Sequence, residues 1–158
     1  MQKNLLIMSE MPQYFINLAD KNFNTHKLWL QDDEDKFISE IQEKVDAIAV
    51  MGGYKITPEL MKSMTNLKII ACYGVGYDAI DIAYAKSLGI KVTNTPEVLN
   101  DEVADTAIAL MLCVYRQILE ADKFARNNSW VNGEFPLTKK FSGSKLGIVG
   151  MGRIGKAI

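Results

Sequence analysis

The chain has 158 residues, of which 48% are hydrophobic and 23% charged, and its formal net charge is -1. This balance predicts one medium domain, or one small domain with part of another, and excludes the basic stripe or polybasic patch that nucleic acid or a membrane surface would require. The apolar run at residues 5–8 is too short for a signal peptide, so we expect a cytoplasmic protein. Cys72 and Cys113 lack metal-ligand spacing, and we expect both to be buried, reduced thiols.

Short apolar runs alternate with helical patterns along the first 95 residues, which is typical of βαβ units and a parallel sheet. Five strands are predicted, at residues 5–8, 27–30, 47–51, 67–72 and 91–93. Helices are expected to begin near Pro12, within the acidic cluster 32–35, and at Thr57-Pro58. The acidic cluster complements a helix N-terminus, and no His or Cys accompanies it to form a metal site. The predicted fold is an α/β, flavodoxin-like layer that binds ligands at the carboxyl ends of its strands.

Two glycine turns follow predicted strands. Gly52-Gly53 follows the third strand, and the segment 73–78 follows the fourth. Each turn could simply reverse the chain, because glycine adopts positive φ without steric cost. Alternatively, both turns expose backbone amides at one rim of the sheet and form a concavity that suits a small carboxylate. On this second interpretation the candidate substrate-binding residues are Gly52, Gly53, Gly74, Val75 and Gly76.

Residues 100–126 are predicted to form one long helix, about 40 Å at the usual rise per residue. Its middle, at residues 107–114, is apolar on every face, so other structure must cover it. A chain of this length offers limited cover, which favours burial between domains or against a second subunit over a position in the chain's own core. We therefore expect a homodimer formed through residues 100–158.

A Gly-x-Gly-x-x-Gly motif occupies residues 150–155, after the apolar run 146–149 that is predicted as a buried parallel strand. In a dinucleotide-binding turn, Gly150 permits the tight turn, Gly152 lets the backbone approach the phosphates, and Gly155 allows close packing of helix on strand. The acidic residue that contacts the ribose is expected about 20 residues further on. Because that position lies beyond residue 158, NAD and NADP cannot be distinguished from this sequence.

Four segments together resemble the N-terminal half of a D-isomer-specific 2-hydroxyacid dehydrogenase of the glyoxylate/hydroxypyruvate reductase type. They are residues 73–81, 92–96, 98–105 and 146–155. The resemblance implies a split, flavodoxin-like substrate domain at residues 1–98. It also implies that residues 99–158 form the long helix, first strand and glycine turn of a truncated Rossmann domain that binds NAD or NADP.

The family also implies roles for individual residues. The amides of Val75 and Gly76 would hold the substrate carboxylate, and the Gly52-Gly53 loop would close over the substrate. Asn100 stands where the family usually has Thr, near the nicotinamide side of the cofactor. The glycine turn, with Gly150, Gly152 and Gly155, would lie along the pyrophosphate. The side chains of Arg153 and Ile154 in the same turn would also lie there.

The chemistry of the family is reversible hydride transfer between a nicotinamide cofactor and a small 2-keto or 2-hydroxy acid, here glyoxylate or hydroxypyruvate. An Arg that orients the substrate, and a His paired with a carboxylate for proton transfer, belong to the family's second half and have no counterpart in this chain. His26 matches no catalytic position and is expected at the surface or a strand edge. We therefore expect this chain alone to be inactive. The alternatives are a nucleotide-sensing, corepressor-like scaffold and a non-functional truncated remnant.

Overall fold

The computed structural model describes residues 2–158. Its contacts divide the chain into two compact units, one extending to Pro96 and the other comprising Glu97–Ile158. The sequence places the corresponding boundary two residues later. No helix within residues 2–158 is long and apolar enough to cross a membrane.

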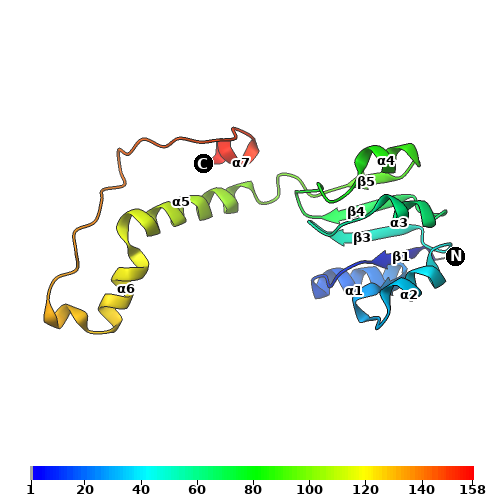
Figure 1. The fold of residues 1–158 in the computed structure, drawn as a ribbon, viewed down its shortest axis with the longest axis horizontal. Coiled ribbons are helices and arrows are strands. Elements are labelled where there is room, and N and C mark those ends of the chain that lie inside the picture. The colour runs from blue at the N-terminus through cyan, green and yellow to red at the C-terminus, as the bar shows by residue number, and fades with distance from the viewer. Residues whose placement is uncertain (1) are drawn as a thin grey trace. The chain divides into compact units, whose positions relative to one another are not determined.

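The first unit contains a five-stranded parallel sheet with the order β2-β1-β3-β4-β5 (Figure 1). The strands are β1 (Asn4–Ile7), β2 (Asn24–Lys27), β3 (Ala47–Met51), β4 (Ile69–Tyr73) and β5 (Lys91–Thr93). This is the flavodoxin-like order, in which the connections change direction between β1 and β3. The predicted α/β, flavodoxin-like fold with five parallel strands is confirmed.

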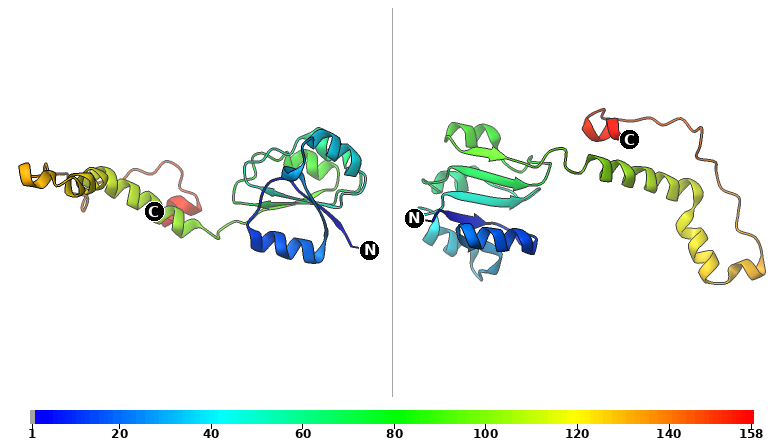
Figure 2. Two further views of the ribbon diagram at one scale, coloured as in Figure 1. Left: turned by 90° about the horizontal axis from the view of Figure 1, so that it is seen from below. Right: turned by 180° about the vertical axis from the view of Figure 1, so that it is seen from behind.

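Helices cover the sheet on both faces, as Figure 2 shows. They are α1 (Gln13–Asn22), α2 (Glu34–Ile41), α3 (Pro58–Ser63) and α4 (Ile82–Ser87). Two of the predicted helix starts are confirmed by side-chain caps. Asp33 accepts a hydrogen bond from the Lys36 amide at 3.0 Å, and Thr57 accepts one from the Leu60 amide at 3.2 Å.

Successive side chains of each strand point to opposite faces of the sheet, and they pack into two hydrophobic cores, one on each face. Leu6, Ile48 and Ile70 face α2, α3 and α4, whereas Ile7 and Ala49 face α1. Helix α1 covers the part of the sheet formed by β1 and β3. On the same face, the register aligns Ala49 with Ala71 of β4 and Thr93 of β5, and these last two residues remain exposed.

The predicted position of the second strand is wrong. The structure places β2 at Asn24–Lys27, and the predicted residues 28–30 form the 3-10 helix η1 (Leu28–Leu30). Leu28 is buried in the core, while Leu30 points outward. Because β2 pairs with β1 alone, it is an edge strand that needs no apolar run, so its polar residues gave no strand signal.

The second unit contains α5 (Asn100–Arg116), α6 (Ile118–Arg126), η2 (Ser129–Asn132) and α7 (Arg153–Ala157), and α7 packs beside α5 (Figure 1). The predicted single helix over residues 100–126 is wrong. Gln117 has left-handed backbone angles, φ 49° and ψ 45°, and separates α5 from α6. The returning chain holds the end of α5, because Arg116 donates to Thr138 at 3.0 Å and the Tyr115 ring meets the Phe141 ring edge-on at 5.5 Å.

The predicted buried strand at residues 146–149 is also absent. These residues form no strand, and Leu146 and Val149 are exposed. A strand needs a neighbour to satisfy its backbone groups, and within residues 2–158 every paired strand belongs to the first unit.

The cysteines differ in part from the prediction that both thiols are buried. Both are free, but Cys72 is buried and Cys113 only half-buried.

Candidate functional site

The parallel strands bring the two predicted glycine turns together at one rim of the sheet. The Gly52 amide, after β3, donates to the Tyr73 carbonyl at the end of β4, at 3.1 Å. A Cβ atom added to Gly74 would lie 3.1 Å from the Gly52 Cα and 3.2 Å from its nitrogen, closer than side chains normally approach backbone. The two turns therefore pack backbone against backbone, which requires glycine at position 74.

In the turn after β4, the carbonyl groups of residues 73–77 accept hydrogen bonds, whereas the amides of residues 74–78 donate none within residues 2–158. The Gly74 carbonyl accepts from the Thr95 amide at 2.9 Å, and the Val75 carbonyl accepts from Asn94 Nδ2 at 2.8 Å. Within residues 2–158 the amides of Val75 and Gly76 donate to no other group. Successive free amides in a turn form a concavity that binds anions, so this turn can take a carboxylate.

Two tyrosine hydroxyls lie beside this rim. Tyr14 of α1 and Tyr73 of β4 share a hydrogen bond of 2.7 Å between their oxygens. That bond is the main reason why the pKa of Tyr14 is raised, so its phenol stays protonated at neutral pH. Tyr14 was not predicted as a neighbour of this rim, because 59 residues separate it from Tyr73 and its own position carries no local signal.

A further polar group at the rim is the hydroxyl of Ser9, a residue that follows β1. Its Oγ is the single buried side-chain polar atom without a hydrogen-bond partner among residues 2–158. Buried hydroxyls are normally bonded, so this atom is available to a ligand or a water molecule.

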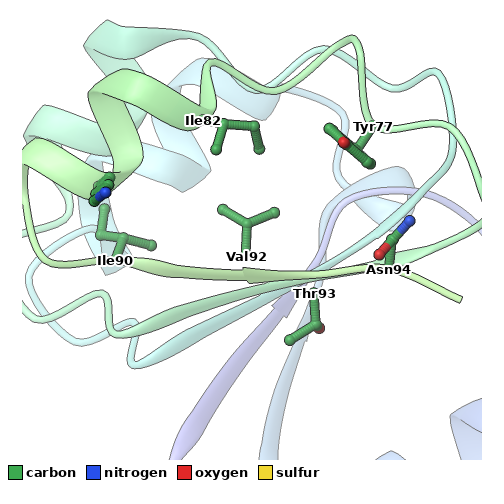
Figure 3. Close-up of a pocket in the computed structure, with 7 residues that line it drawn as sticks. Tyr77, Ile82, Ile90, Val92, Thr93 and Asn94 are labelled. Atoms are coloured by element: carbon green, nitrogen blue, oxygen red, sulfur yellow. The ribbon is translucent and has the colours of Figure 1, made fainter. Parts of the chain in front are cut away.

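A cavity of about 390 Å³ lies on the β5 side of the turn (Figure 3). Its apolar lining comes from Ile82, Ile90 and Val92, which point into the space between α4 and β5, while Tyr77 and Asn94 stand at one end. Asn94 therefore belongs both to this cavity and to the hydrogen bonding of the turn. Among residues 2–158, no group of three or more His, Cys, Asp or Glu side chains could hold a metal ion.

In the second unit, the three glycines of the 150–155 segment differ in the room that they leave for a side chain. Gly150 has φ +97°, and a methyl group at Gly155 would overlap the Gly150 carbonyl oxygen. An added Cβ at Gly152 would meet no atom within 4 Å, so backbone there is open to approach. These glycines thus fit a pyrophosphate, although residues 146–149 before them form no strand.

The side chains predicted around the cofactor have these positions. Arg153 Nη1 lies 3.3 Å from a carboxylate oxygen of Glu97, in an exposed ion pair. Asn100 is the first residue of α5, and both it and Ile154 are half-buried.

His26 lies in the edge strand β2, with its Nε2 atom 3.2 Å from Asn4 Oδ1, and so occupies a strand edge as expected. Burial lowers the pKa of His26, and the charge of Lys44 adds to this effect.

Residues 5–148 match the family model described as "D-isomer specific 2-hydroxyacid dehydrogenase, catalytic domain". The chain belongs to this family. A glyoxylate/hydroxypyruvate reductase of Arabidopsis thaliana is 38% identical over 98% of this chain and 49% of its own length. The chain thus spans about half the length of the curated relatives it matches.

Solved structures of the family share the fold. A 2-hydroxyacid dehydrogenase from Ketogulonicigenium vulgare superposes with a TM-score of 0.93 and 36% identity, over 99% of this chain and 50% of that one. An NADPH-dependent glyoxylate/hydroxypyruvate reductase from Sinorhizobium meliloti, crystallised with NADP and malonate, has a TM-score of 0.85 and 36% identity, over 99% and 49% of the two chains. The family expected from the four sequence motifs is confirmed.

Proposed function

We propose that this chain is the N-terminal half of an NAD(P)-dependent reductase that acts on a small 2-keto acid, glyoxylate or hydroxypyruvate. The observation that carries the proposal is the pair of free amides at Val75 and Gly76, beside a second glycine turn at the carboxyl rim of the sheet. The names of the Arabidopsis and Sinorhizobium relatives support the same class of substrate.

In this proposal the chain binds and orients the substrate without exchanging a proton. The Val75 and Gly76 amides donate to the carboxylate, and the Gly52-Gly53 turn closes over the substrate. No side chain of the 74–76 segment is ionisable, so these residues supply no proton. The Arg, His and carboxylate that complete the chemistry are assigned, by the family resemblance, to the second half of the reductase. The chain alone is then inactive.

The proposed cofactor is NAD or NADP, which supplies a hydride to the keto carbon when it is bound. The Gly150–Gly155 turn, with the flanking Arg153 and Ile154, would hold the pyrophosphate. Asn100 would lie on the nicotinamide side, where its amide can donate a hydrogen bond. The corresponding division of the chain is a substrate domain over residues 1–98 and the beginning of a cofactor domain over residues 99–158.

The activity can be tested by joining this chain to the second half of the Arabidopsis reductase. We expect the joined protein to oxidise NADH or NADPH with glyoxylate or hydroxypyruvate, and the isolated chain to show no turnover. A folded chimaera that binds NADPH but reduces neither of these acids would contradict the proposal.

Within the chimaera, Val75→Pro tests the amide directly, since proline has no N–H to donate. A hydrogen bond to a charged group contributes about 1.5–3 kcal/mol, so KM for the keto acid should rise roughly tenfold or more. Val75→Ala keeps the amide and is the matched control. Circular dichroism should show that both variants fold, and an unchanged KM in the folded Val75→Pro protein would argue against carboxylate binding here.

We also propose that the chain forms a homodimer through residues 100–158. Several apolar residues of α5 and α6 are exposed in the second unit, most of all Val114 at 76%, Leu119 at 63% and Leu110 at 61%. Exposed apolar surface of this kind marks an interface or an aggregation site.

A further inference from the structure

The Asn94 side chain lies outside the turn and bonds to one of the turn's own carbonyl groups. It follows β5 directly, is half-buried, and donates from Nδ2 to the Val75 carbonyl at 2.8 Å. Its neighbour Thr95 donates its amide to the Gly74 carbonyl at 2.9 Å. Figure 3 shows Asn94 just past the end of β5, on the same side of the cavity as Tyr77.

The planarity of the peptide bond connects these two contacts to the two free amides. A carbonyl group and the N–H of the following residue lie in one rigid plane and, in a trans peptide, point in opposite directions. The Gly74 carbonyl shares its plane with the Val75 amide, and the Val75 carbonyl shares its plane with the Gly76 amide. Thr95 therefore bonds to the carbonyl side of the peptide plane that carries the Val75 amide. Asn94 bonds in the same way to the plane that carries the Gly76 amide, and both amides are free on the opposite side.

We infer that Asn94 is a positioning residue for the substrate carboxylate, acting through the Val75–Gly76 peptide plane; this inference rests on the proposed function. The side-chain amide anchors the Val75 carbonyl and so aims the Gly76 N–H at the anion. It also polarises that peptide, because a carbonyl that accepts a hydrogen bond makes the attached N–H a stronger donor.

Asparagine suits this position for reasons of charge and of length. Aspartate at neutral pH has no proton to donate, and its carboxylate would repel both the Val75 carbonyl and an incoming anion. Serine could donate, but its side chain is one atom shorter and would fall short of the carbonyl. Thr95 donates its backbone amide to the Gly74 carbonyl. The peptide plane that carries the Val75 amide therefore stays bonded when the Asn94 side chain is changed.

The test uses the whole 158-residue chain labelled with ¹⁵N and titrated with oxalate as the anion probe. In the unaltered chain, the Val75 and Gly76 amide resonances should shift with a common Kd. In Asn94→Ala, Kd should rise about tenfold, and the Gly76 resonance should lose most of its response while Val75 retains its own. Asn94→Asp at pH 7 should weaken binding further.

Asn66→Ala is the matched control, because Asn66 also donates from Nδ2 to a backbone carbonyl, that of Glu43. That bond precedes β3 and β4, at the opposite ends of the strands. This variant should lower the urea midpoint without changing Kd or the two resonances. A loss of stability in Asn94→Ala like that of Asn66→Ala, with Kd and the Gly76 response unchanged, would overturn the inference and leave the proposed function standing. No shift at either amide of the unaltered chain would count against the proposed function itself.

Discussion

At the scale of single residues, the contact between Gly74 and Gly52 leaves no room for a side chain. Neither Gly74 nor Gly76 has a positive φ, so substitution by alanine tests space alone. Gly74→Ala forces the two turns apart, and we expect it to destabilise the first unit by about 1–3 kcal/mol, as overpacking does. Urea unfolding followed by circular dichroism measures the change.

Gly76→Ala is the natural comparison for that variant. Its added Cβ would meet Asp78 Oδ2 at 3.7 Å, an ordinary contact. Its stability should stay within about 1 kcal/mol of the original, because alanine also restricts the unfolded chain. Equal losses in both variants would show that the close approach of the two turns is not what requires glycine.

His26 makes stability depend on pH near neutrality. Burial lowers its folded pKa below the unfolded value of about 6.5, so the unfolded chain takes up a proton first as the pH falls. Its contribution is fully present above that value and is lost as the pH falls through the folded pKa. The pKa values of Asp20 and Asp46 are lowered by their lysine partners, so those carboxylates lose their contributions only at lower pH.

We therefore expect the urea midpoint to fall between pH 7.5 and 5.5, and to fall less in His26→Gln. The comparison should be made at equal ionic strength, since Lys44 contributes to the shift. Parallel midpoints for the two proteins across this range would contradict the assignment to His26.

At the scale of elements, the break between α5 and α6 depends on the left-handed conformation of Gln117. Glycine adopts that conformation at no steric cost, so Gln117→Gly should stabilise the second unit by about 0.5–1 kcal/mol. In one continuous helix the same change would destabilise by about 1 kcal/mol, and Gln117→Ala would stabilise instead. The signs of the two changes therefore decide between the two structures. Trp130 fluorescence, in a Trp29→Phe background, reports unfolding of the second unit alone.

At the scale of the whole molecule, the apolar surface of α5 predicts self-association. Leu110 and Val114 lie four residues apart on the same side of the helix, and both are exposed. Replacing both with glutamate should convert the expected dimer to a monomer in light scattering. Leu18→Glu, on α1 of the first unit and 63% exposed, should leave the dimer intact. A monomeric unaltered chain at high concentration would refute the proposal.

Local chemistry in the sequence was enough to predict most of the first unit. The apolar runs at β1, β3 and β4, the caps at Asp33 and Thr57, and the paired glycine turns each depend on residues close together in the chain. Four short motifs, at residues 73–81, 92–96, 98–105 and 146–155, were enough to identify the family. These features are local because strand alternation, helix capping and turn formation involve neighbouring residues.

Only the tertiary structure decided the features that depend on distant partners. The edge position of β2 removes the need for an apolar run, and the contacts of Arg116 and Tyr115 with the returning chain accompany the helix break at Gln117. The Asn94 bond to Val75 spans 19 residues and requires β5 to lie beside β4 in one particular register. The sequence alone determined which turns would carry glycine, but the order and register of the strands decided which amides those turns leave free. The physical reason is that a hydrogen bond between distant residues depends on the packing of the whole sheet.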